Sequence, residues 1–109
     1  MKIGYASGRL QRSLQEEASA KKAYGVLARR IRMRMQVLEL AENLDDVPRV
    51  PPTRCHELTG DLAGHLAVDL NGNDRLVFKP VGEIPRKEDG GLDWRGVKEI
   101  EIVAIGDYH

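Results

Sequence analysis

Three prolines, at positions 48, 51 and 52, divide the 109-residue chain into halves with different hydrophobic patterns. Before them, apolar residues recur every three to four positions, which is typical of amphipathic helices. After them, short apolar runs alternate with polar residues and end at turn-forming residues, which is typical of strands. A chain whose helices come first and whose strands follow is expected to be α+β, with the helices packed on one face of a sheet.

The first half contains two predicted helices, over about residues 9–22 and 26–44. The second helix is the stronger prediction, because its apolar residues form two stripes. One stripe consists of Leu27, Ile31, Met35 and Leu38, and the other of Val26, Met33, Val37 and Leu40. A helix with two apolar stripes is expected to have two neighbours. One neighbour is the sheet, and the second is either the first helix or a separate protein.

The second half is predicted to hold strands at about 54–58, 65–70, 75–79 and 97–107, and residues 2–6 are a candidate edge strand. Asn71-Gly72-Asn73 is a strong hairpin signal. Residues 80–96 read as a long irregular excursion anchored by Trp94. The run Ile102–Ile105 is apolar on both faces, which indicates a central strand, inside the sheet and away from its edges. We expect one domain, residues 1–109, with two helices on a small, twisted, mostly antiparallel sheet.

The sequence carries no sign of a membrane or an oxidising compartment. No apolar run approaches the ~20 residues that cross a bilayer, and residues 1–5 include no apolar stretch of signal-peptide length. The single cysteine, Cys55, cannot form an internal disulfide, so we expect a cytoplasmic protein. Because there is no Walker loop, dinucleotide fingerprint or zinc-ligand spacing, no cofactor and no metal are predicted.

Strand alternation gathers basic side chains on one face of the predicted sheet. If Leu76 and Phe78 pack under the helices, Arg75 and Lys79 point the other way. Arg54 and His56 share a face in the strand before. Such a face suits a phosphate chain, and the competing interpretation is an ordinary solvated surface.

Three segments together resemble the HigB-type killer toxins of the RelE/ParE superfamily of bacterial toxin–antitoxin systems. They are the run 54–64, the hairpin 68–78 and the final Asp107-Tyr108-His109. The helical half is similar in pattern only. The resemblance implies a RelE/ParE-like fold and a metal-independent endonuclease that cleaves mRNA on the ribosome. It also implies a cognate antitoxin, of the helix-turn-helix type, as partner.

The resemblance assigns catalytic roles to five residues: His56, Arg75, Asp107, Tyr108 and His109. RNA cleavage by acid–base chemistry needs a base for the 2′-hydroxyl proton, an acid for the leaving 5′-oxygen and cations for the phosphate. His56 and His109 are the proton carriers, in either order, and Arg75 binds the phosphate. Asp107 would orient a histidine or bind a ribose hydroxyl, and Tyr108 would stack on a base or donate its proton.

The chain has a formal net charge of zero, yet residues 1–34 hold nine basic and two acidic side chains. A polyanion responds to such a local patch, because exposed charges are screened over about 8 Å. The residues expected to contact RNA phosphates are Arg29, Arg30, Arg32, Arg34, Arg54 and Lys79. A helix charged only for solubility, or for an acidic antitoxin, is the competing interpretation.

Two other functions stay open at this point. One is a non-catalytic inhibitor of DNA gyrase, as ParE-like members of the superfamily are, and the other is a plain RNA-binding module. The paired proton carriers His56 and His109 favour the enzyme, because an inhibitor does not need them. The second apolar stripe of the long helix predicts that the antitoxin binds the helical layer.

Overall fold

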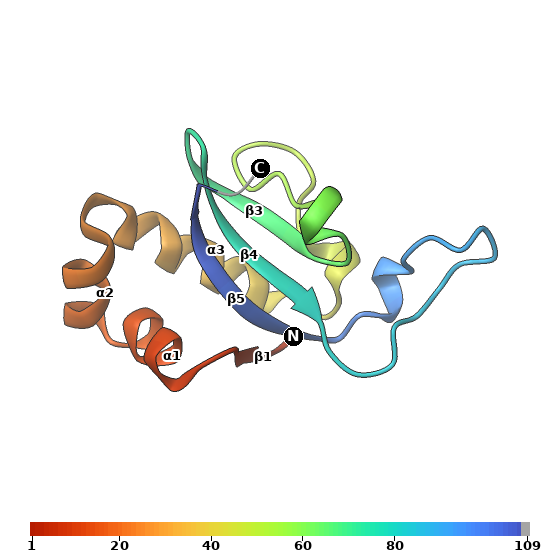
Figure 1. The fold of residues 1–109 in the computed structure, drawn as a ribbon, viewed down its shortest axis with the longest axis horizontal. Helices are drawn as coiled ribbons and strands as arrows, with labels where there is room; N and C mark the ends of the chain where they lie inside the picture. The colour runs from red at the N-terminus through yellow and green to blue at the C-terminus, as the bar shows by residue number, and fades with distance from the viewer. Residues whose placement is uncertain (108–109) are drawn as a thin grey trace.

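The computed structural model describes residues 1–107 and has an α+β fold in which helices lie against one face of a five-stranded sheet (Figure 1). The helices are α1 (Gly8–Gln15), α2 (Glu17–Tyr24) and α3 (Ala28–Leu40). The strands are β1 (Lys2–Tyr5), β2 (His56–Glu57), β3 (Leu66–Asn71), β4 (Asp74–Pro80) and β5 (Glu99–Asp107). No helix in this part of the chain is long and apolar enough to cross a membrane.

The segment expected to be one N-terminal helix forms two, so there are three helices among the described residues where two were predicted. Glu16 is extended (φ −96°, ψ 122°) and separates α1 from α2. The hydroxyl oxygens of Ser13 and Tyr24 lie 2.7 Å apart and join the two helices across this bend. A straight helix would hold Leu10 and Tyr24 about 21 Å apart. The bend instead allows both to pack against the same core.

The two apolar stripes of the long helix have different environments. Ile31, Met35 and Leu38 of the first stripe are buried. The second stripe is largely exposed: Val26, Met33 and Leu40 retain 92%, 48% and 85% of their accessible surface. The sheet therefore accounts for one expected neighbour, and neither α1 nor α2 covers the other stripe.

The long helix ends at Leu40, four residues earlier than predicted. A separate 3-10 turn, Leu44–Asp46, follows it. Asn43 begins this turn, since its side-chain oxygen accepts a hydrogen bond from the Asp45 N–H at 2.9 Å. The change of direction buries Leu44 and Val47 in the core, which a continuing helix would not do.

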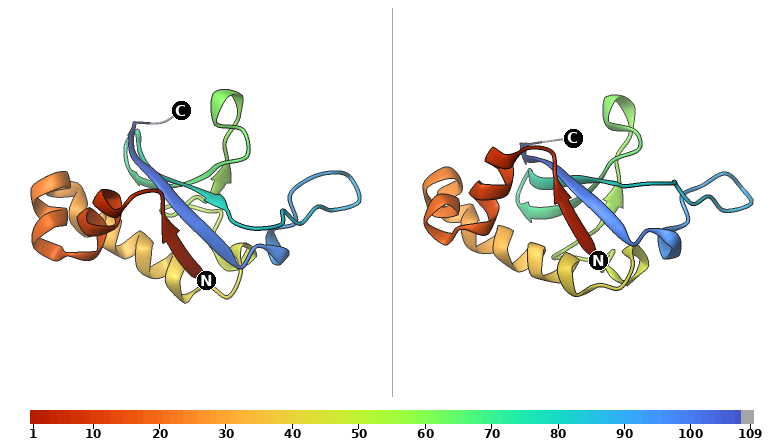
Figure 2. Two further views of the ribbon diagram at one scale, coloured as in Figure 1. Left: turned by 60° about the horizontal axis from the view of Figure 1, so that its bottom comes forward. Right: turned by 90° about the horizontal axis from the view of Figure 1, so that it is seen from below.

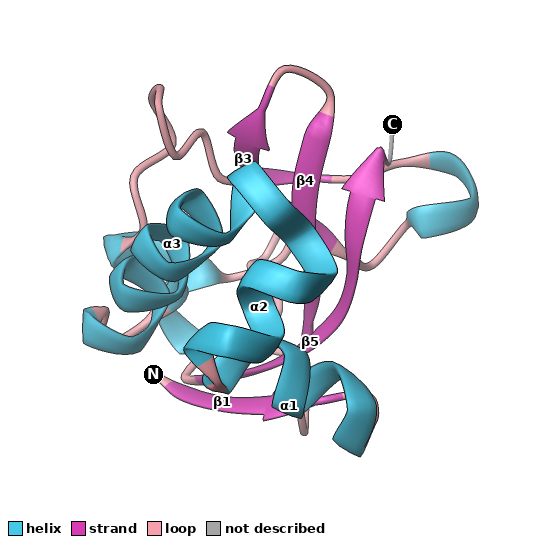
Figure 3. Cartoon of the chain, turned by 90° about the vertical axis from the view of Figure 1, so that its left-hand side faces the viewer, coloured by secondary structure: helices cyan, strands magenta, loops and turns pink. Residues whose placement is uncertain are grey.

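The strands are arranged in the order β1-β5-β4-β3-β2. β1 pairs with β5 in parallel, and the other neighbours are antiparallel. The edge strand near the N-terminus, the 71–73 hairpin and the interior position of the last strand are confirmed. β2 is shorter than predicted, because Arg54 has a φ of 42° and leaves the extended conformation before His56. Figure 3 shows α2 and α3 in front of the sheet.

The hydrophobic core lies between α3 and the sheet. Leu76 and Phe78 of β4 are fully buried there, as alternation predicted. The opposite face was expected to be open to solvent. At its centre, however, Ala67 and Val77 are also fully buried. On that face, therefore, only the residues around Ala67 and Val77 are exposed to solvent.

Residues 81–96, which we call the arm, project from one end of the molecule, and α1 and α2 lie at the other end (Figures 1 and 2). A bridge between Arg86 and Leu92 closes the arm. Trp94 is 7% exposed, and its indole N–H donates to a Glu57 carboxylate oxygen at 3.2 Å. The Arg49 guanidinium lies 3.6 Å above the indole ring. Trp94 thus anchors the arm, as predicted.

Candidate functional site

Strand register places three polar residues on the sheet face that points away from the helices. Asp69 of β3 pairs with Arg75 of β4, and His56 of β2 pairs with Ala67. Paired residues of antiparallel strands point to the same face, as do residues two apart along one strand. His56, Asp69 and Arg75 therefore share this face, in adjacent rows.

Asp69 links the two arginines of the candidate site. Its carboxylate accepts two hydrogen bonds from the Arg54 guanidinium, at 2.5 and 3.0 Å. This hydrogen bonding raises the pKa of Arg54 further above its ordinary value. The same carboxylate lies 3.5 Å from Arg75 Nε, which is ion-pair range without hydrogen-bond geometry. The Arg75 side chain, 11% exposed, also donates from Nη1 to the Asn73 carbonyl at 2.9 Å.

The ring of His56 is held in one orientation by the backbone. Its Nδ1 lies 2.7 Å from the carbonyl oxygen of Arg54. A carbonyl only accepts hydrogen bonds, so Nδ1 carries the proton. In the neutral ring the lone pair is then on Nε2. His56 is thereby prepared to accept a proton at Nε2 or, as imidazolium, to donate one.

The backbone around Arg54 is held in an unusual conformation. Its φ of 42° lies in the left-handed region, which costs a non-glycine residue roughly 1–2 kcal/mol. Arg34 of α3 holds two backbone segments next to Arg54, one at Pro52 and one at Asp69. Its guanidinium donates to the Asp69 carbonyl at 2.7 Å and to the Pro52 carbonyl at 3.4 Å. The long helix is thus tied to the loop that presents Arg54 and His56.

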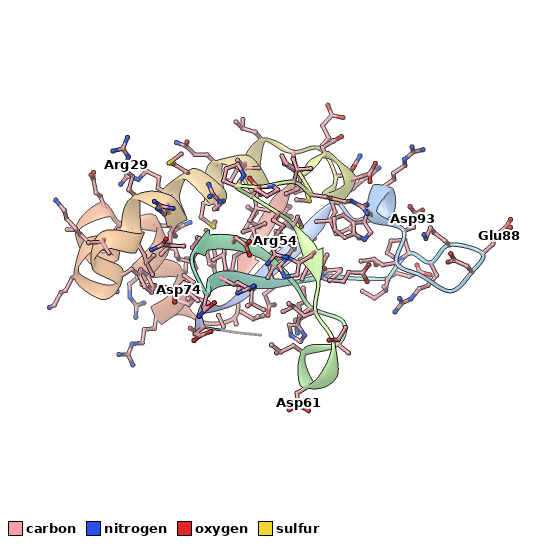
Figure 4. The ribbon with its side chains drawn as sticks, turned by 90° about the horizontal axis from the view of Figure 1, so that it is seen from above. Arg29, Arg54, Asp61, Asp74, Glu88 and Asp93 are labelled. Carbon is pink, nitrogen blue, oxygen red and sulfur yellow. The ribbon has the colours of Figure 1, made fainter. Side chains whose placement is uncertain are left out.

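Arg34 is a correction to the expected set of phosphate-binding residues. It is only 5% exposed, and its donors are taken up by backbone carbonyls, so it braces the fold instead of facing an RNA chain. Arg29, Arg30 and Arg32 are exposed on α3. Arg32 lies 3.4 Å from Glu17, and Arg30 donates to the Leu70 carbonyl at 3.3 Å. Figure 4 shows Arg29 extending away from the helix, whereas Arg54 lies over the middle of the fold.

The last described strand ends beside the arginine cluster. Gly106 pairs with Arg75, and Asp107 pairs with Asp74. The described chain thus ends opposite Asp74, one residue pair beyond Arg75. Tyr108 and His109, the other two residues expected at the catalytic centre, lie outside the described residues. Lys79, the remaining cation expected on this face, is half exposed and lies 3.9 Å from Glu101.

Cys55 sits between Arg54 and His56 and points into the core. It is 2% exposed, and burial raises the pKa of its thiol to about 12. The thiol is therefore protonated at neutral pH and is a poor nucleophile. Among residues 1–107, no cluster of three His, Cys, Asp or Glu side chains is placed to hold a metal ion.

Asp69 was not among the site residues expected from the sequence. The signal was present, because Asp69 alternates with the core residues Val68 and Leu70. The roles of Arg34 and of the Glu57–Trp94 hydrogen bond carried no such signal. Each joins elements that are more than 30 residues apart in sequence.

Comparison with known proteins supports the fold. No protein-family model matches the chain, and no curated protein matches its sequence. A "YoeB/ParE toxin" from Agrobacterium tumefaciens has a similar structure (TM-score 0.59, 13% identity), and the match covers 100% of both chains. A chain of a "YoeB-YefM complex" from Staphylococcus aureus is also similar (TM-score 0.55, 13% identity), with 100% of this chain and 97% of that chain covered.

At 13% identity these similarities establish a shared fold. The α+β arrangement expected from the sequence is shared with these two structures over the whole chain. The resemblance to the RelE/ParE superfamily stays a prediction, and so does the narrower resemblance to the HigB subtype.

Proposed function

We propose that this chain is the toxin of a type II toxin–antitoxin system and that it cleaves mRNA on the ribosome without a metal ion. The observation that carries the proposal is the fixed ring of His56, on the same sheet face as two arginines. A proton carrier with a defined tautomer beside cationic phosphate ligands is what acid–base cleavage of RNA requires. The toxin fold of the structural neighbours supports it.

In the proposed reaction, a base removes the proton of the ribose 2′-hydroxyl, and the 2′-oxygen attacks the adjacent phosphorus. The bond from phosphorus to the 5′-oxygen breaks, and an acid protonates the leaving oxygen. His56 performs one of these transfers through Nε2, and His109 performs the other. Arg75 and Arg54 offset the charge that develops on the phosphate oxygens. Asp107 and Tyr108 orient the histidine or the nucleotide.

The test is cleavage of an mRNA bound to bacterial ribosomes by the purified chain in the presence of EDTA. We expect cuts in the ribosome-bound transcript and none in the naked RNA. Expression in bacteria gives the functional class. Growth arrest with fragmented transcripts supports the proposal, and arrest with DNA damage indicates a gyrase inhibitor. Growth without arrest contradicts a toxin of either kind.

We also propose that the cognate antitoxin binds the helical layer. Met33 and Leu40 are exposed on α3 at seven-residue spacing, about 10 Å apart along the helix axis, and the exposed Val26 lies in the 3-10 turn Gly25–Leu27 just before α3. A groove of about 630 Å³ lies between α2 and α3, and its lining includes Val26, Met33 and the basic residues Lys21 and Arg29. An amphipathic helix with acidic flanking residues fits such a surface, whereas a second basic copy of α3 would be repelled.

This proposal is tested with Met33→Ser and Leu40→Ser against the control Ile84→Ser on the arm, which is 37% exposed. Binding of the antitoxin encoded beside the toxin should weaken at least tenfold in the first two variants and stay unchanged in the third. Cleavage activity should be unchanged in all three. A complex whose partner touches only the sheet face near His56 and Arg75 would contradict this docking site.

A further inference from the structure

Asp69 interacts with several segments of the chain besides its own strand. Its N–H donates to the Thr53 carbonyl at 2.9 Å, and its carbonyl accepts from Arg34 at 2.7 Å. Its carboxylate binds Arg54 through two hydrogen bonds and faces Arg75. One residue thus links the proline-rich loop, α3 and β4.

These interactions are possible because β2 is short. It pairs only with Leu66 and Ala67, so the outer edge of β3 is open at Asp69. Thr53 and Arg34 occupy that edge and fix the Asp69 backbone. The aspartate side chain has only two rotatable bonds, and a fixed backbone therefore confines its carboxylate to a small volume between the two guanidinium groups.

The carboxylate offsets a repulsion that the site would otherwise contain. Two guanidinium groups gathered on one patch repel each other, and the repulsion is stronger near a protein surface than in bulk water. Asp69 reduces the charge of this patch from two positive charges to one. Arg75 Nε is buried and has no hydrogen-bond acceptor among residues 1–107, so the Asp69 carboxylate 3.5 Å away is the charge that offsets it.

We propose that Asp69 is a positioning residue that holds Arg54 and Arg75 as a preformed clamp for one RNA phosphate. The proposal rests on the RNA cleavage proposed above. Asp69 lowers the affinity of the clamp for phosphate through its negative charge, and it raises turnover by fixing both cations before the substrate arrives. Its removal should therefore change binding and turnover in opposite directions.

The test is Asp69→Asn, which keeps the side-chain shape and removes the charge. We expect RNA oligonucleotides to bind about fivefold more tightly at low salt, with a log–log salt slope steeper by about 0.7. Turnover at saturating RNA should fall about tenfold or more. The matched control is Glu101→Gln, which removes the acid 3.9 Å from Lys79 on the same face. It should tighten binding similarly and leave turnover unchanged.

A readout without RNA separates this proposal from the function on which it rests. The Nε–H proton of Arg54, bonded to Asp69, should exchange slowly in NMR spectra of the wild type and of Glu101→Gln. In Asp69→Asn its signal should broaden or disappear. This comparison tests whether Asp69 orders Arg54 even if the wild type cleaves no RNA. In that case only the cleavage proposal is lost.

Two results would overturn the role of Asp69. A retained Arg54 signal with unchanged turnover in Asp69→Asn would show that the aspartate does not order the clamp. Weaker RNA binding together with lower turnover and a lower melting temperature would assign Asp69 a structural role alone. A melting curve on each sample makes this distinction.

Discussion

The cations of α3 and the cations of the sheet face are held in different ways. Arg29 and Arg30 have no carboxylate within ion-pair distance among the described residues, although Arg30 donates to the Leu70 carbonyl, and Arg32 has only an exposed partner in Glu17. On the sheet, Arg54 and Arg75 share Asp69, and Lys79 lies near Glu101. Exposed charge attracts a polyanion from a distance but fixes no geometry, whereas paired charge has a defined position and a smaller net field.

The largest expected effect is on the sheet side, where chemistry is proposed. His56→Ala, and separately deletion of His109, should each lower cleavage of ribosome-bound mRNA about 100-fold or more. The variant with both changes should lose less activity than the product of the two single losses, because both residues act in one step. Arg29→Ala on the helix is the control and should keep its turnover. Full cleavage by either folded sheet-side variant would remove that residue from the site.

Arg34 is an exception to this comparison, because it lies on α3 but its guanidinium hydrogen-bonds to the backbone beside the sheet-side arginines. Arg34→Ala leaves the carbonyls of Asp69 and Pro52 without donors and should lower the free energy of unfolding by about 2–3 kcal/mol. Urea unfolding measures this loss. Exposed Arg29→Ala should change it by less than about 0.5 kcal/mol. Equal stability of the two variants would contradict the brace.

The helix side should control affinity and its salt dependence. For the double variant Arg29→Ala and Arg30→Ala, the log–log salt slope of RNA binding should fall by about 0.7 for each phosphate that the variant no longer neutralises. Turnover at saturating RNA should not change. Lys87→Ala on the arm, where Asp89 lies 3.7 Å away, is the control and should leave the slope unchanged. An unaltered slope in the double variant would show that Arg29 and Arg30 do not neutralise RNA phosphates, and it would favour an acidic antitoxin as their partner.

The last prediction concerns pH and the burial of Cys55 beneath the sheet-side residues. The unfolded thiol loses its proton near its ordinary pKa of 9.0, whereas the folded thiol keeps it up to about pH 12. The folded state therefore binds more protons in this range, and stability falls as pH rises, by up to about 1.4 kcal/mol per pH unit. Cys55→Ala should make this slope shallower between pH 9 and 11 in urea unfolding, and the part that remains comes from other groups such as Tyr5, whose pKa burial also raises. The same slope in both proteins would contradict the burial.

The features that the sequence predicted correctly have local signals. Asn71-Gly72-Asn73 marks the hairpin through turn chemistry, and Leu76 and Phe78 mark the core face through alternation. The interior position of β5 followed from an apolar run on both faces. Each of these can be read within about ten residues.

The features that were missed depend on interactions between distant segments. The bend at Glu16 brings α1 and α2 to one core, and no local breaker such as glycine or proline announces it. The helix period places Arg34 between the apolar stripes and Arg32 on the outer face. The carbonyls of Asp69 and Pro52 that Arg34 binds, however, lie 35 and 18 residues away in sequence and have no local signal. The left-handed backbone conformation of Arg54 likewise depends on contacts with distant segments, since local sterics disfavour it.

The anchoring of the arm makes the molecule suitable for optical measurement. Trp94 is the only tryptophan in the sequence. Its indole is buried, lies under Arg49 and is hydrogen-bonded to Glu57, the neighbour of His56. Emission from a single indole in this environment reports on one location, and that location adjoins the strand carrying the histidine. Intrinsic fluorescence can thus follow the edge of the candidate site in real time, without a dye or an engineered label.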